Sequence, residues 1–355
     1  MSVHMVIAAP RVRAINLSDP RECTRVDDFV RKSAAGSPFH LPAWNRAVAQ
    51  GCNQTSHFFI AEANAKIVGV LPLTEVHSPI FGRALVSAGY AVGGGVLSAD
   101  PAIADLLVDA AVGLAGRLSC PTLELKGGAL PEGWHHDTVT YVGFARQLAS
   151  DDDAELLQIP RKQRAEVRRA LGLELAISVG RETADRDAHY TTYATSVRNL
   201  GTPVFPRALF EAVLDGFGDD ADILTVRHHG RPVASVLSLY HDNIVMPYWG
   251  GGTSEARALR ANELMYFKLM RHAHARGCQI FDFGRSKVGT GAAAYKKNWG
   301  FEPHPLRYAK LALDGKAPRS INPLDPKYSL QIKLWQKLPL VVANRLGPLI
   351  ARGLG

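Results

Sequence analysis

The chain has 355 residues, of which 46% are hydrophobic and 21% are charged, values typical of a folded globular protein. This composition excludes collagen-like, coiled-coil and disordered proteins, and the length predicts about two domains. Lysine and arginine outnumber aspartate and glutamate by 41 to 33, and the net charge of +8 favours an anionic partner: nucleic acid, a phosphorylated substrate or a membrane surface.

The four cysteines are widely separated and form no C-x-x-C pair, so we predict neither a disulfide framework nor a metal site. The first ten residues lack the basic segment of a secretory signal, and no apolar run reaches the ~20 residues that span a bilayer. We therefore expect a cytoplasmic protein that is soluble or peripheral to a membrane.

The first half of the chain predicts three strands, a helix and a fourth strand. The strands are expected at residues 57–62, 67–76, 83–92 and 122–126. The third of them ends in the glycines 93–95. The helix runs from about Asp100 to Leu118, with Asp100 as N-cap and Pro101 at the first helical position.

The second half predicts the same order. Strands are expected at 222–226, 232–240, 244–249 and 279–283, and a long helix at 257–276 follows the glycines 250–252. Two helical stretches, 153–171 and 185–200, lie between the halves. The repeated order and the two glycine runs predict an internal duplication.

A first candidate site is the strand–glycine–helix junction WGGGTSEARALRAN. Glycines allow close backbone approach to a ligand, and a helix N-terminus attracts phosphate. Arg257 and Arg260 oppose the helix dipole there and make more sense as ligand clamps than as stabilising residues. A plain tight turn is the alternative. The substrate-binding residues predicted here are Tyr248, Trp249, Gly250, Gly251, Gly252, Arg260 and Asn262.

A second candidate is FDFGRSKVGT, in which a buried strand carries Asp282 into a loop with Arg285 and Lys287. An ion pair between Asp282 and Arg285 that merely holds the loop is the alternative to a catalytic role. A third is GAAAYKKNWGFEP, a short helix that ends at Gly300. A three-residue spacing places Ala293, Lys296 and Trp299 on one face. A desolvated lysine there has a lowered pKa or serves as a fixed cation for an oxyanion, whereas a snorkelling lysine does neither.

Two further segments are basic. QIPRKQRAEVRR carries five cations within nine residues and favours an anionic ligand over a solvated helix face. Its predicted binding residues are Arg161, Lys162, Arg164 and Arg168. The tail, residues 330–354, mixes apolar side chains with lysine and arginine, and Pro339 and Pro348 are expected to break it into short pieces. It either docks on the protein's own core or lies in a membrane interface that carries anionic lipid.

The order of elements and the A-x-x-x-K-x-x-W-G-F pattern resemble the GNAT N-acyltransferase fold. In that family a tyrosine four residues before the glycine often serves as general acid, and here that position is Lys296, preceded by Tyr295. This replacement resembles the FemAB family of tandem GNAT proteins. Such enzymes move an amino acid from aminoacyl-tRNA onto a peptidoglycan-precursor peptide.

Longer segments are similar to one FemAB branch, the proteins associated with the PEP-CTERM/exosortase system of bacterial exopolysaccharide loci. The segments are PRKQRAEVRR, NLGTPVFP, RPVASVLS, PYWGGGT, ANELMYFKLMRHA, ARGCQIFDFGRSKVGTG, KKNWGFEP and NPLDPKYSLQIKLWQKLPL. The resemblance runs from about Pro38 to the C-terminus.

The resemblance implies an α+β protein with two tandem GNAT-like domains, each a mostly antiparallel sheet flanked by helices. We expect them at residues 1–150 and 151–315, with a basic-apolar tail at 316–355. The implied activity is acyl or aminoacyl transfer onto an amine or hydroxyl of a cell-envelope or exopolysaccharide precursor, on the cytoplasmic face of the inner membrane. An acetyl-CoA-dependent N-acetyltransferase and a non-catalytic component of a polysaccharide assembly system are the alternatives.

Lys296 would then stabilise the oxyanion, with Lys297 a weaker candidate, and Asp282 would orient Arg285 or assist proton removal. Trp249 and the glycines 250–252 would line a donor channel. The basic segment at 161–168 would hold an anionic lipid- or nucleotide-linked glycan or peptide acceptor. Lys287 and Tyr295 complete the predicted binding residues.

No permanently bound cofactor is expected, and the acyl donor is aminoacyl-tRNA or acyl-CoA. The acetyl-CoA loop R/Q-x-x-G-x-G/A is absent, since the corresponding loop reads GGTSEARALRAN, and there is no long coiled-coil insertion of the kind that some FemAB enzymes use with tRNA. The sequence therefore leaves the donor open. No DNA-binding motif is recognised.

Overall fold

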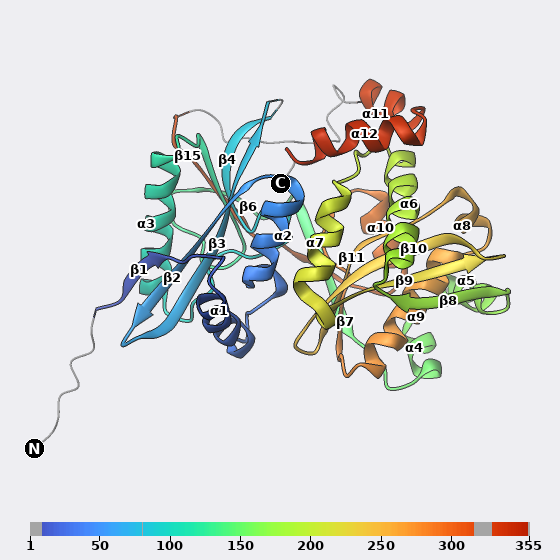
Figure 1. Ribbon diagram of the computed structural model, residues 1–355. Coiled ribbons are helices and arrows are strands. Elements are labelled where there is room, and N and C mark those ends of the chain that lie inside the picture. Colours follow the sequence, from blue (N-terminus) through green and yellow to red (C-terminus); the bar gives the residue numbers. More distant parts are fainter. Residues whose placement is uncertain (1–8, 80, 316–328, 354–355) are drawn as a thin grey trace, which may run out of the picture. The chain divides into compact units, whose positions relative to one another are not determined.

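The computed structural model describes residues 9–79, 81–315 and 329–353 (Figure 1). The described residues form two compact units. Among the described residues, unit 1 comprises 9–79, 81–137, 307–315 and 352–353, and unit 2 comprises 138–306 and 329–351. Each unit is an α+β structure built on one sheet.

Unit 1 has seven strands in the order β1-β2-β3-β4-β5-β15-β6. The strands are β1 (Arg11–Ala14), β2 (Thr55–Ala63), β3 (Lys66–Ser78), β4 (Gly82–Ser87), β5 (Thr122–Lys126), β6 (His135–Asp137) and β15 (Tyr308–Ala312). The helices are α1 (Pro20–Lys32), the 3-10 turn η1 (Pro38–His40), α2 (Pro42–Cys52) and α3 (Pro101–Arg117). β4 and β5 are parallel, and the other neighbours are antiparallel.

Helix α3 covers one face of this sheet, and α1 and α2 lie on the other (Figure 1). Asp100 caps α3 through its carboxylate, which accepts a hydrogen bond from Ala102 N, as the sequence predicts. Gly69 lies directly beneath the helix. A Cβ there would come within 2.9 Å of Ile103 Cγ2 and 3.0 Å of Leu107 Cδ1, so glycine allows α3 to pack closely against β3.

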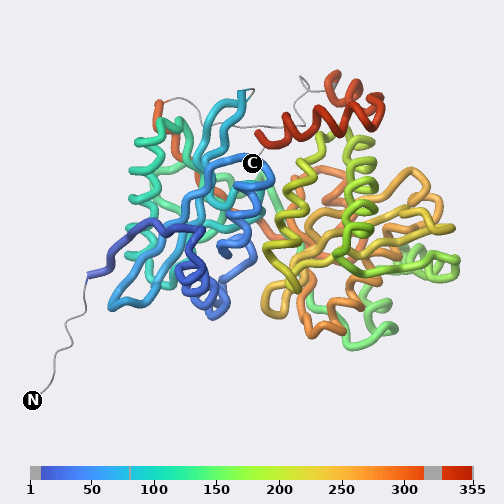
Figure 2. The backbone as a smooth tube through the Cα atoms, viewed as in Figure 1, coloured from blue at the N-terminus to red at the C-terminus, as the bar shows by residue number. Residues whose placement is uncertain are grey.

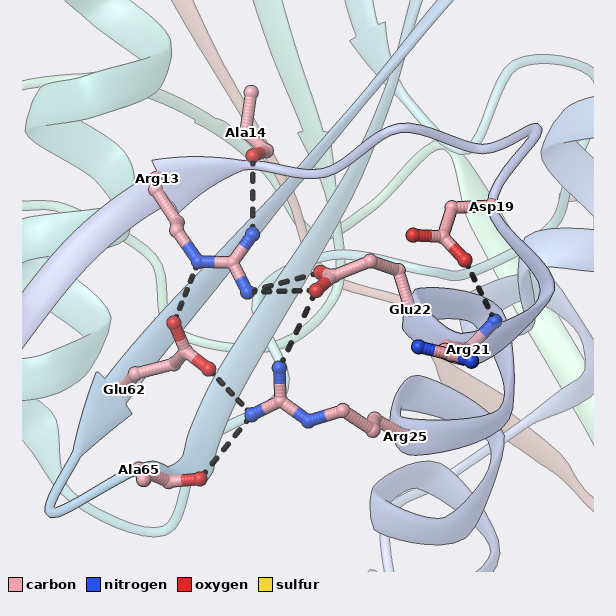
Figure 3. Close-up of polar contacts among 8 residues, drawn as sticks. All are labelled: Arg13, Ala14, Asp19, Arg21, Glu22, Arg25, Glu62 and Ala65. Atoms are coloured by element: carbon pink, nitrogen blue, oxygen red, sulfur yellow. Dashed lines mark hydrogen bonds and ion pairs between the residues drawn. The ribbon is translucent and has the colours of Figure 1, made fainter.

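Four charged residues fix α1 to the edge of the unit 1 sheet (Figure 3). Glu62 of β2 accepts hydrogen bonds from Arg13 Nε of β1 and from the Arg25 guanidinium of α1. Glu22 of α1 accepts from Arg13 Nη2 at 3.1 Å. The alternating charges neutralise one another, and hydrogen bonds from both arginines lower the pKa of Glu62 below its ordinary value.

Unit 2 is built on the strands β13-β7-β12-β11-β10-β9-β8, with β14 also paired to β7. The strands are β7 (Tyr141–Gln147), β8 (Leu175–Gly180), β9 (Ala221–His228), β10 (Arg231–His241), β11 (Ile244–Gly252), β12 (Ile280–Asp282), β13 (Ser286–Lys287) and β14 (Pro303–Pro305). The helices are α4 (Asp152–Gln158), α5 (Arg161–Leu171), α6 (Thr183–Asn199), α7 (Arg207–Phe217), the 3-10 turn η2 (Gly218–Asp220), α8 (Ser254–Ala258), α9 (Ala261–Ala275), α10 (Gly291–Asn298), α11 (Ser329–Gln336) and α12 (Leu340–Ala351).

The two sheets repeat one plan. In each, four strands run antiparallel, the fourth pairs in parallel with a fifth, and the next strand is antiparallel to the fifth. That last strand is β15 in unit 1 and β7 in unit 2. The duplication predicted from the order of elements is therefore present in the fold.

The strands β7 and β15 change the domain boundaries. β7 falls within the predicted domain 1–150, yet its residues pair with β12 of unit 2 through Ile280↔Gln147. β15 falls within the predicted domain 151–315, yet it pairs with β5 of unit 1 through Tyr308↔Lys126. The chain thus supplies the sixth strand of each sheet from a segment that sequence order assigned to the other unit.

Two predicted element boundaries are wrong. The strand expected at 83–92 ends at Ser87, because Ala88 and Tyr90 adopt positive φ angles of 40° and 64°. The helix expected at 257–276 is divided into α8 and α9, because Arg260 lies in the left-handed region with φ 53°. Consequently the glycines 93–95 lie beyond β4, whereas the glycines 250–252 form the end of β11, and the two runs are not equivalent.

The tail contains two helices that pack on α6 of unit 2 (Figure 2). Pro339 lies between α11 and α12, as predicted, but Pro348 lies inside α12 and does not end it. Gln336 Nε2 donates to Asn199 O at 3.2 Å, and Ala343 is 2% exposed. The described part of the tail thus docks on the protein's own core; residues 316–328, 354 and 355 lie outside the described chain.

Candidate active site

The parallel strands of unit 2 separate soon after they begin. β11 and β12 pair only at Ile244↔Ile280 and Val245↔Phe281. Beyond Val245, β11 carries a bulge opposite Leu237 and Ser238, and a bulge increases the local twist of a strand. No pair beyond Val245↔Phe281 joins the two strands, so sheet pairing leaves their carboxyl ends unjoined.

Helix α10 lies at the carboxyl end of β12. Thr290 caps it by accepting a hydrogen bond from Ala293 N at 3.3 Å, and Gly300, with φ 82°, reverses the chain after it. Ala293 is 5% exposed and Trp299 is fully buried, which confirms the predicted inward face. Lys296 belongs to that face and is half-buried, whereas Lys297 is exposed.

The Lys296 ammonium is held by the loop that follows β12. Its Nζ donates to Gly284 O at 3.1 Å and to Arg285 O at 3.0 Å. It also lies over the rings of Phe144 and Phe283, 5.5 and 5.3 Å from their centroids. An ammonium has three N–H groups, so two are committed to backbone carbonyls and one remains.

Burial perturbs the charge of this lysine. Desolvation lowers the pKa of Lys296 from 10.5 to about 8, and the positive charge of Arg285 adds to the decrease, while Asp282 opposes it. The group is still mostly protonated near neutrality, but it loses its proton far more readily than an exposed lysine. A fixed, partly desolvated cation of this kind can stabilise negative charge that develops on a bound substrate.

Asp282 ends β12 and its carboxylate turns back on its own loop. Oδ1 accepts a hydrogen bond from Gly284 N at 2.8 Å. Burial raises the pKa of Asp282, opposed by that hydrogen bond and by the charges of His304 and Lys296. The Arg285 guanidinium lies over the Tyr141 ring, 4.7 Å from its centroid, so its packing is set by β7.

Lys287 belongs to the same loop. It pairs in β13 with Tyr141 of β7, and its carbonyl accepts a hydrogen bond from Thr290 Oγ1 at 2.7 Å. The loop that carries Arg285 and Lys287 is therefore fixed at both ends, by β7 and by the cap of α10.

The glycine run of β11 is explained by helix packing on both faces. A Cβ on Gly250 would meet Tyr266 OH at 2.9 Å, and one on Gly252 would meet Asn262 Oδ1 at 2.6 Å, both from α9. A Cβ on Gly251 would meet Ser196 of α6 at 2.5 Å. These contacts account for the glycines without a ligand, so their predicted role in lining a donor channel stays a prediction.

Trp249 is buried, and its predicted role in a donor channel stays a prediction. It is 4% exposed and packs on Phe210 with a centroid distance of 4.7 Å, so its ring belongs to the core beneath α7. Tyr248 is half-buried and packs edge-on to Trp249. Because successive strand residues point to opposite faces, except at a bulge, the sequence could not tell which of the two faces the core.

The start of α9 holds two predicted residues. Arg260, expected to bind phosphate, forms an ion pair with Glu166 of α5 and donates to Arg257 O. Asn262 Oδ1 is buried without a hydrogen-bond partner among the described residues. Glu263 is also in this first turn, and burial raises the pKa of its carboxyl group. The Arg260 guanidinium is thus already neutralised by the Glu166 carboxylate.

Tyr266 connects these segments, and sequence analysis missed it. Its ring packs on Phe283 at 4.6 Å, on Tyr295 at 6.1 Å and on Trp299 at 6.2 Å, and its hydroxyl lies under Gly250. Burial raises the pKa of both Tyr266 and Tyr295. The i, i+4 spacing of Asn262 and Tyr266 on one helix face was the available signal.

Helix α5 brings the predicted basic residues to the same region. Gly300, at the end of α10, lies against Pro160 and Gln158, because a Cβ there would be 3.0 Å from Pro160 Cδ. The predicted binding cations Arg161, Lys162 and Arg168 are exposed and Arg164 is half-buried, and none of them forms an ion pair within the described chain. Three motifs that are distant in sequence therefore meet around α10.

A separate hollow of about 420 Å³ lies between α6 and α7. Arg181, Arg186 and Arg207 line it, and each is paired with a carboxylate: Asp219, Asp215 and Asp187, respectively. It contains none of the predicted site residues. Because its charges neutralise one another, we do not assign the active site to this hollow.

Comparison with known proteins connects this geometry to a fold. Residues 159–297, which include α5 through most of α10, match the family model described as the acetyltransferase (GNAT) domain. No curated protein matches the chain. Among solved structures, FemX is similar with a TM-score of 0.65 and 14% identity, over 84% of this chain and 96% of that one.

Two other solved structures are similar over most of this chain. A tandem GNAT protein from the clavulanic acid biosynthesis pathway has a TM-score of 0.56 and 13% identity, over 87% of this chain and 100% of that one. The C-terminal domain of a putative lysylphosphatidylglycerol synthetase from Agrobacterium fabrum has a TM-score of 0.56 and 14% identity, over 82% and 91%.

The chain therefore has a tandem GNAT-like fold of the α+β class. The match of residues 159–297 to the acetyltransferase (GNAT) domain model supports an acyltransferase at the general level. Among the described residues, no helix is both long and apolar enough to cross a membrane.

Proposed function

We propose that this protein transfers an acyl or aminoacyl group onto an amine or hydroxyl of a cell-envelope or exopolysaccharide precursor. The observation that carries the proposal is the position of Lys296. Its partly desolvated ammonium is fixed at the carboxyl end of β12, where β11 and β12 have separated.

In the proposed reaction the acceptor's lone pair attacks the carbonyl carbon of the donor ester or thioester. The new C–N or C–O bond forms, the carbonyl oxygen becomes an oxyanion, and the donor C–O or C–S bond breaks when the intermediate collapses. The acceptor's proton passes to the leaving oxygen or sulfur. The remaining N–H of Lys296 stabilises the oxyanion, an interaction that typically contributes about 10²–10³ in rate.

Asp282 is the group next to this cation that can take a proton. Burial raises its pKa, which makes it a stronger base than an exposed aspartate once it is ionised. Its Oδ1 is fixed by Gly284 N, so the carboxylate is held in one orientation. We assign Asp282 to proton removal from the acceptor and Arg285 to the electrostatic environment of Lys296.

The charges at the start of α9 indicate which class of acyl donor the site favours. Arg260, the residue predicted to clamp phosphate, is already paired with Glu166, and Glu263 lies in the first helical turn. Two carboxylates beside a helix N-terminus disfavour a diphosphate, and the acetyl-CoA loop is missing from the sequence. We therefore favour an aminoacyl ester over acyl-CoA as the donor. The unpaired cations of α5 remain to hold an anionic acceptor.

The test supplies both donor classes to the purified full chain. One reaction contains aminoacyl-tRNA charged with labelled amino acids, another contains acetyl-CoA, and each receives an extract of lipid-linked and nucleotide-linked envelope precursors. Mass spectrometry of the acceptors then detects the group gained. An amino-acid increment that depends on charged tRNA supports the proposal, and an acetyl increment identifies the N-acetyltransferase alternative.

Lys296→Met tests the site, with Lys297→Met as the matched control because that neighbouring lysine is exposed. We expect the first variant to lose about 10²–10³ in transfer rate and the second to stay within about twofold of the parent chain. Full activity of Lys296→Met would refute the assignment of the site. If the parent chain bound a precursor tightly but transferred no group to it, the result would support the alternative function, a non-catalytic binding component.

A further inference from the structure

Helix α12 presents an apolar stripe that nothing in the described structure covers. At 100° per residue, Val341, Val342, Arg345, Leu346 and Leu349 fall within an arc of about 140°. All five are exposed, with exposed fractions of 80% for Val341 and 54% for Leu349. The opposite face carries Ala343, Gly347 and Ala351, which are buried. The small residues therefore face the protein, whereas Val341, Val342, Leu346 and Leu349 face outward.

Helix α11 has the same arrangement. Leu330 and Leu334 are 65% and 58% exposed, and Lys333 and Lys337 share their side of the chain. Ile332 points the other way and lies against Gly201, where a Cβ would come within 2.4 Å of Ile332 Cγ2. Both tail helices thus have an inward face for docking and an outward face that combines apolar side chains with a cation, Lys333 in α11 and Arg345 in α12.

The docking of these helices fixes their outward faces. Arg198 Nη1 donates to Gln336 O at 3.2 Å, at the end of α6. Gly347 lies against Val204, where a Cβ would be 3.0 Å from Val204 N. Figures 1 and 2 show α11 and α12 together beside α6. The exposed leucines are therefore held in place by contacts on the reverse side of each helix.

The charge of this surface has one sign. Residues 329–353 contain no aspartate or glutamate, and Lys333, Lys337 and Arg345 are exposed without an ion pair within the described chain. Apolar side chains interspersed with cations are the composition that binds at the interface of an anionic bilayer.

We propose that the outward faces of α11 and α12 form a docking surface for an anionic membrane. The leucines and valines enter the boundary between headgroups and acyl chains, and the three cations contact the acidic headgroups. A second copy of this chain fits less well, because a symmetric contact would bring like charges together around the same stripe. The proposal does not depend on the transferase chemistry.

The experiment is co-sedimentation of the full chain with vesicles. One set contains phosphatidylglycerol and phosphatidylcholine in equal amounts, and the other contains phosphatidylcholine only. We expect binding to the anionic vesicles that weakens as salt is raised. Leu346→Ser/Leu349→Ser should reduce the partition coefficient by about tenfold or more, and Lys333→Gln/Lys337→Gln/Arg345→Gln by about a hundredfold at low salt.

Matched controls make the test specific to this surface. Val139→Ser/Leu157→Ser removes two apolar side chains that are 78% and 67% exposed elsewhere in unit 2. Lys32→Gln/Lys66→Gln/Arg117→Gln removes three exposed cations from unit 1. Both controls should bind the vesicles as the parent chain does, and unchanged thermal unfolding of all four variants would show that their folds are intact.

Equal loss in the control variants, or no preference for anionic vesicles in the parent chain, would overturn the proposal. Sedimentation velocity provides the remaining outcome. The parent chain could bind neither kind of vesicle and instead form a dimer that Leu346→Ser/Leu349→Ser dissociates. That result would assign the stripe to self-association and refute a membrane surface.

Discussion

Replacing Lys296 by methionine should change how the stability of this protein depends on pH. The folded chain holds the pKa of Lys296 at about 8, against an ordinary value of 10.5, because burial disfavours the charged form. Between these two values the unfolded chain binds more protons than the folded chain does. The free energy of unfolding contributed by Lys296 therefore rises as pH increases through this window.

The size of the effect follows from the two pKa values. Integrating the proton-binding difference from pH 7 to pH 10 gives about 2.5 kcal/mol in favour of the folded parent chain relative to Lys296→Met. Hydrogen bonds lost with the ammonium, to Gly284 O and Arg285 O, shift the stability of the variant by a similar amount at every pH. They therefore cancel when the pH dependence is compared.

Urea unfolding of both chains at pH 7, 8, 9 and 10 measures this difference directly. The gap in unfolding free energy between the parent and Lys296→Met should move by about 2.5 kcal/mol over the series. Lys297→Met, which removes an exposed lysine from the same helix, is the matched control. A flat result for Lys296→Met would mean that the ammonium is fully solvated, and the proposed oxyanion site would lose its physical basis.

Two further predictions concern packing and charge. Gly251→Ala places a Cβ 2.5 Å from the Ser196 side chain and should destabilise the protein by about 1–3 kcal/mol in chemical unfolding, whereas Gly291→Ala, with open space around it, should change stability by less than about 0.5 kcal/mol. Adding Ser196→Gly should restore most of the loss, and no rescue would contradict the packing explanation of the glycine run. Glu62→Gln removes the carboxylate that joins Arg13 to α1 and should cost about 1 kcal/mol at pH 7. The folded pKa of Glu62 is lowered from 4.5, so this stabilisation is complete above pH 4.5 and is lost as pH falls through the folded pKa. The unfolding free energies of the parent and the variant should therefore converge in acid. A difference that persists in acid would refute the charge network.

The sequence determined much of the fold from local signals. The Asp100 cap, the hairpins, the small helix ending at Gly300 and the inward face with Ala293 and Trp299 were all predicted and are present. Each depends on side chains within a few residues of one another, and periodicity or capping chemistry reports such contacts directly. Lys296 was placed on the buried face of its helix by the same reasoning.

Only the tertiary structure decided which segments complete each sheet. β7 and β15 are short strands whose partners lie more than a hundred residues away in sequence, so no local pattern shows which of the two sheets each joins. The break at Arg260 is similar, because its left-handed backbone accompanies an ion pair with Glu166 on another helix.

The difference between the two glycine runs has the same origin. Both runs read alike in the sequence, but their close neighbours differ. Gly250–Gly252 lie between helices α6 and α9, whereas Gly94 and Gly95 lie against Ala88 and Gly127. Local chemistry specifies an element and its buried face. Which distant element meets that face depends on contacts that form only when the whole unit folds.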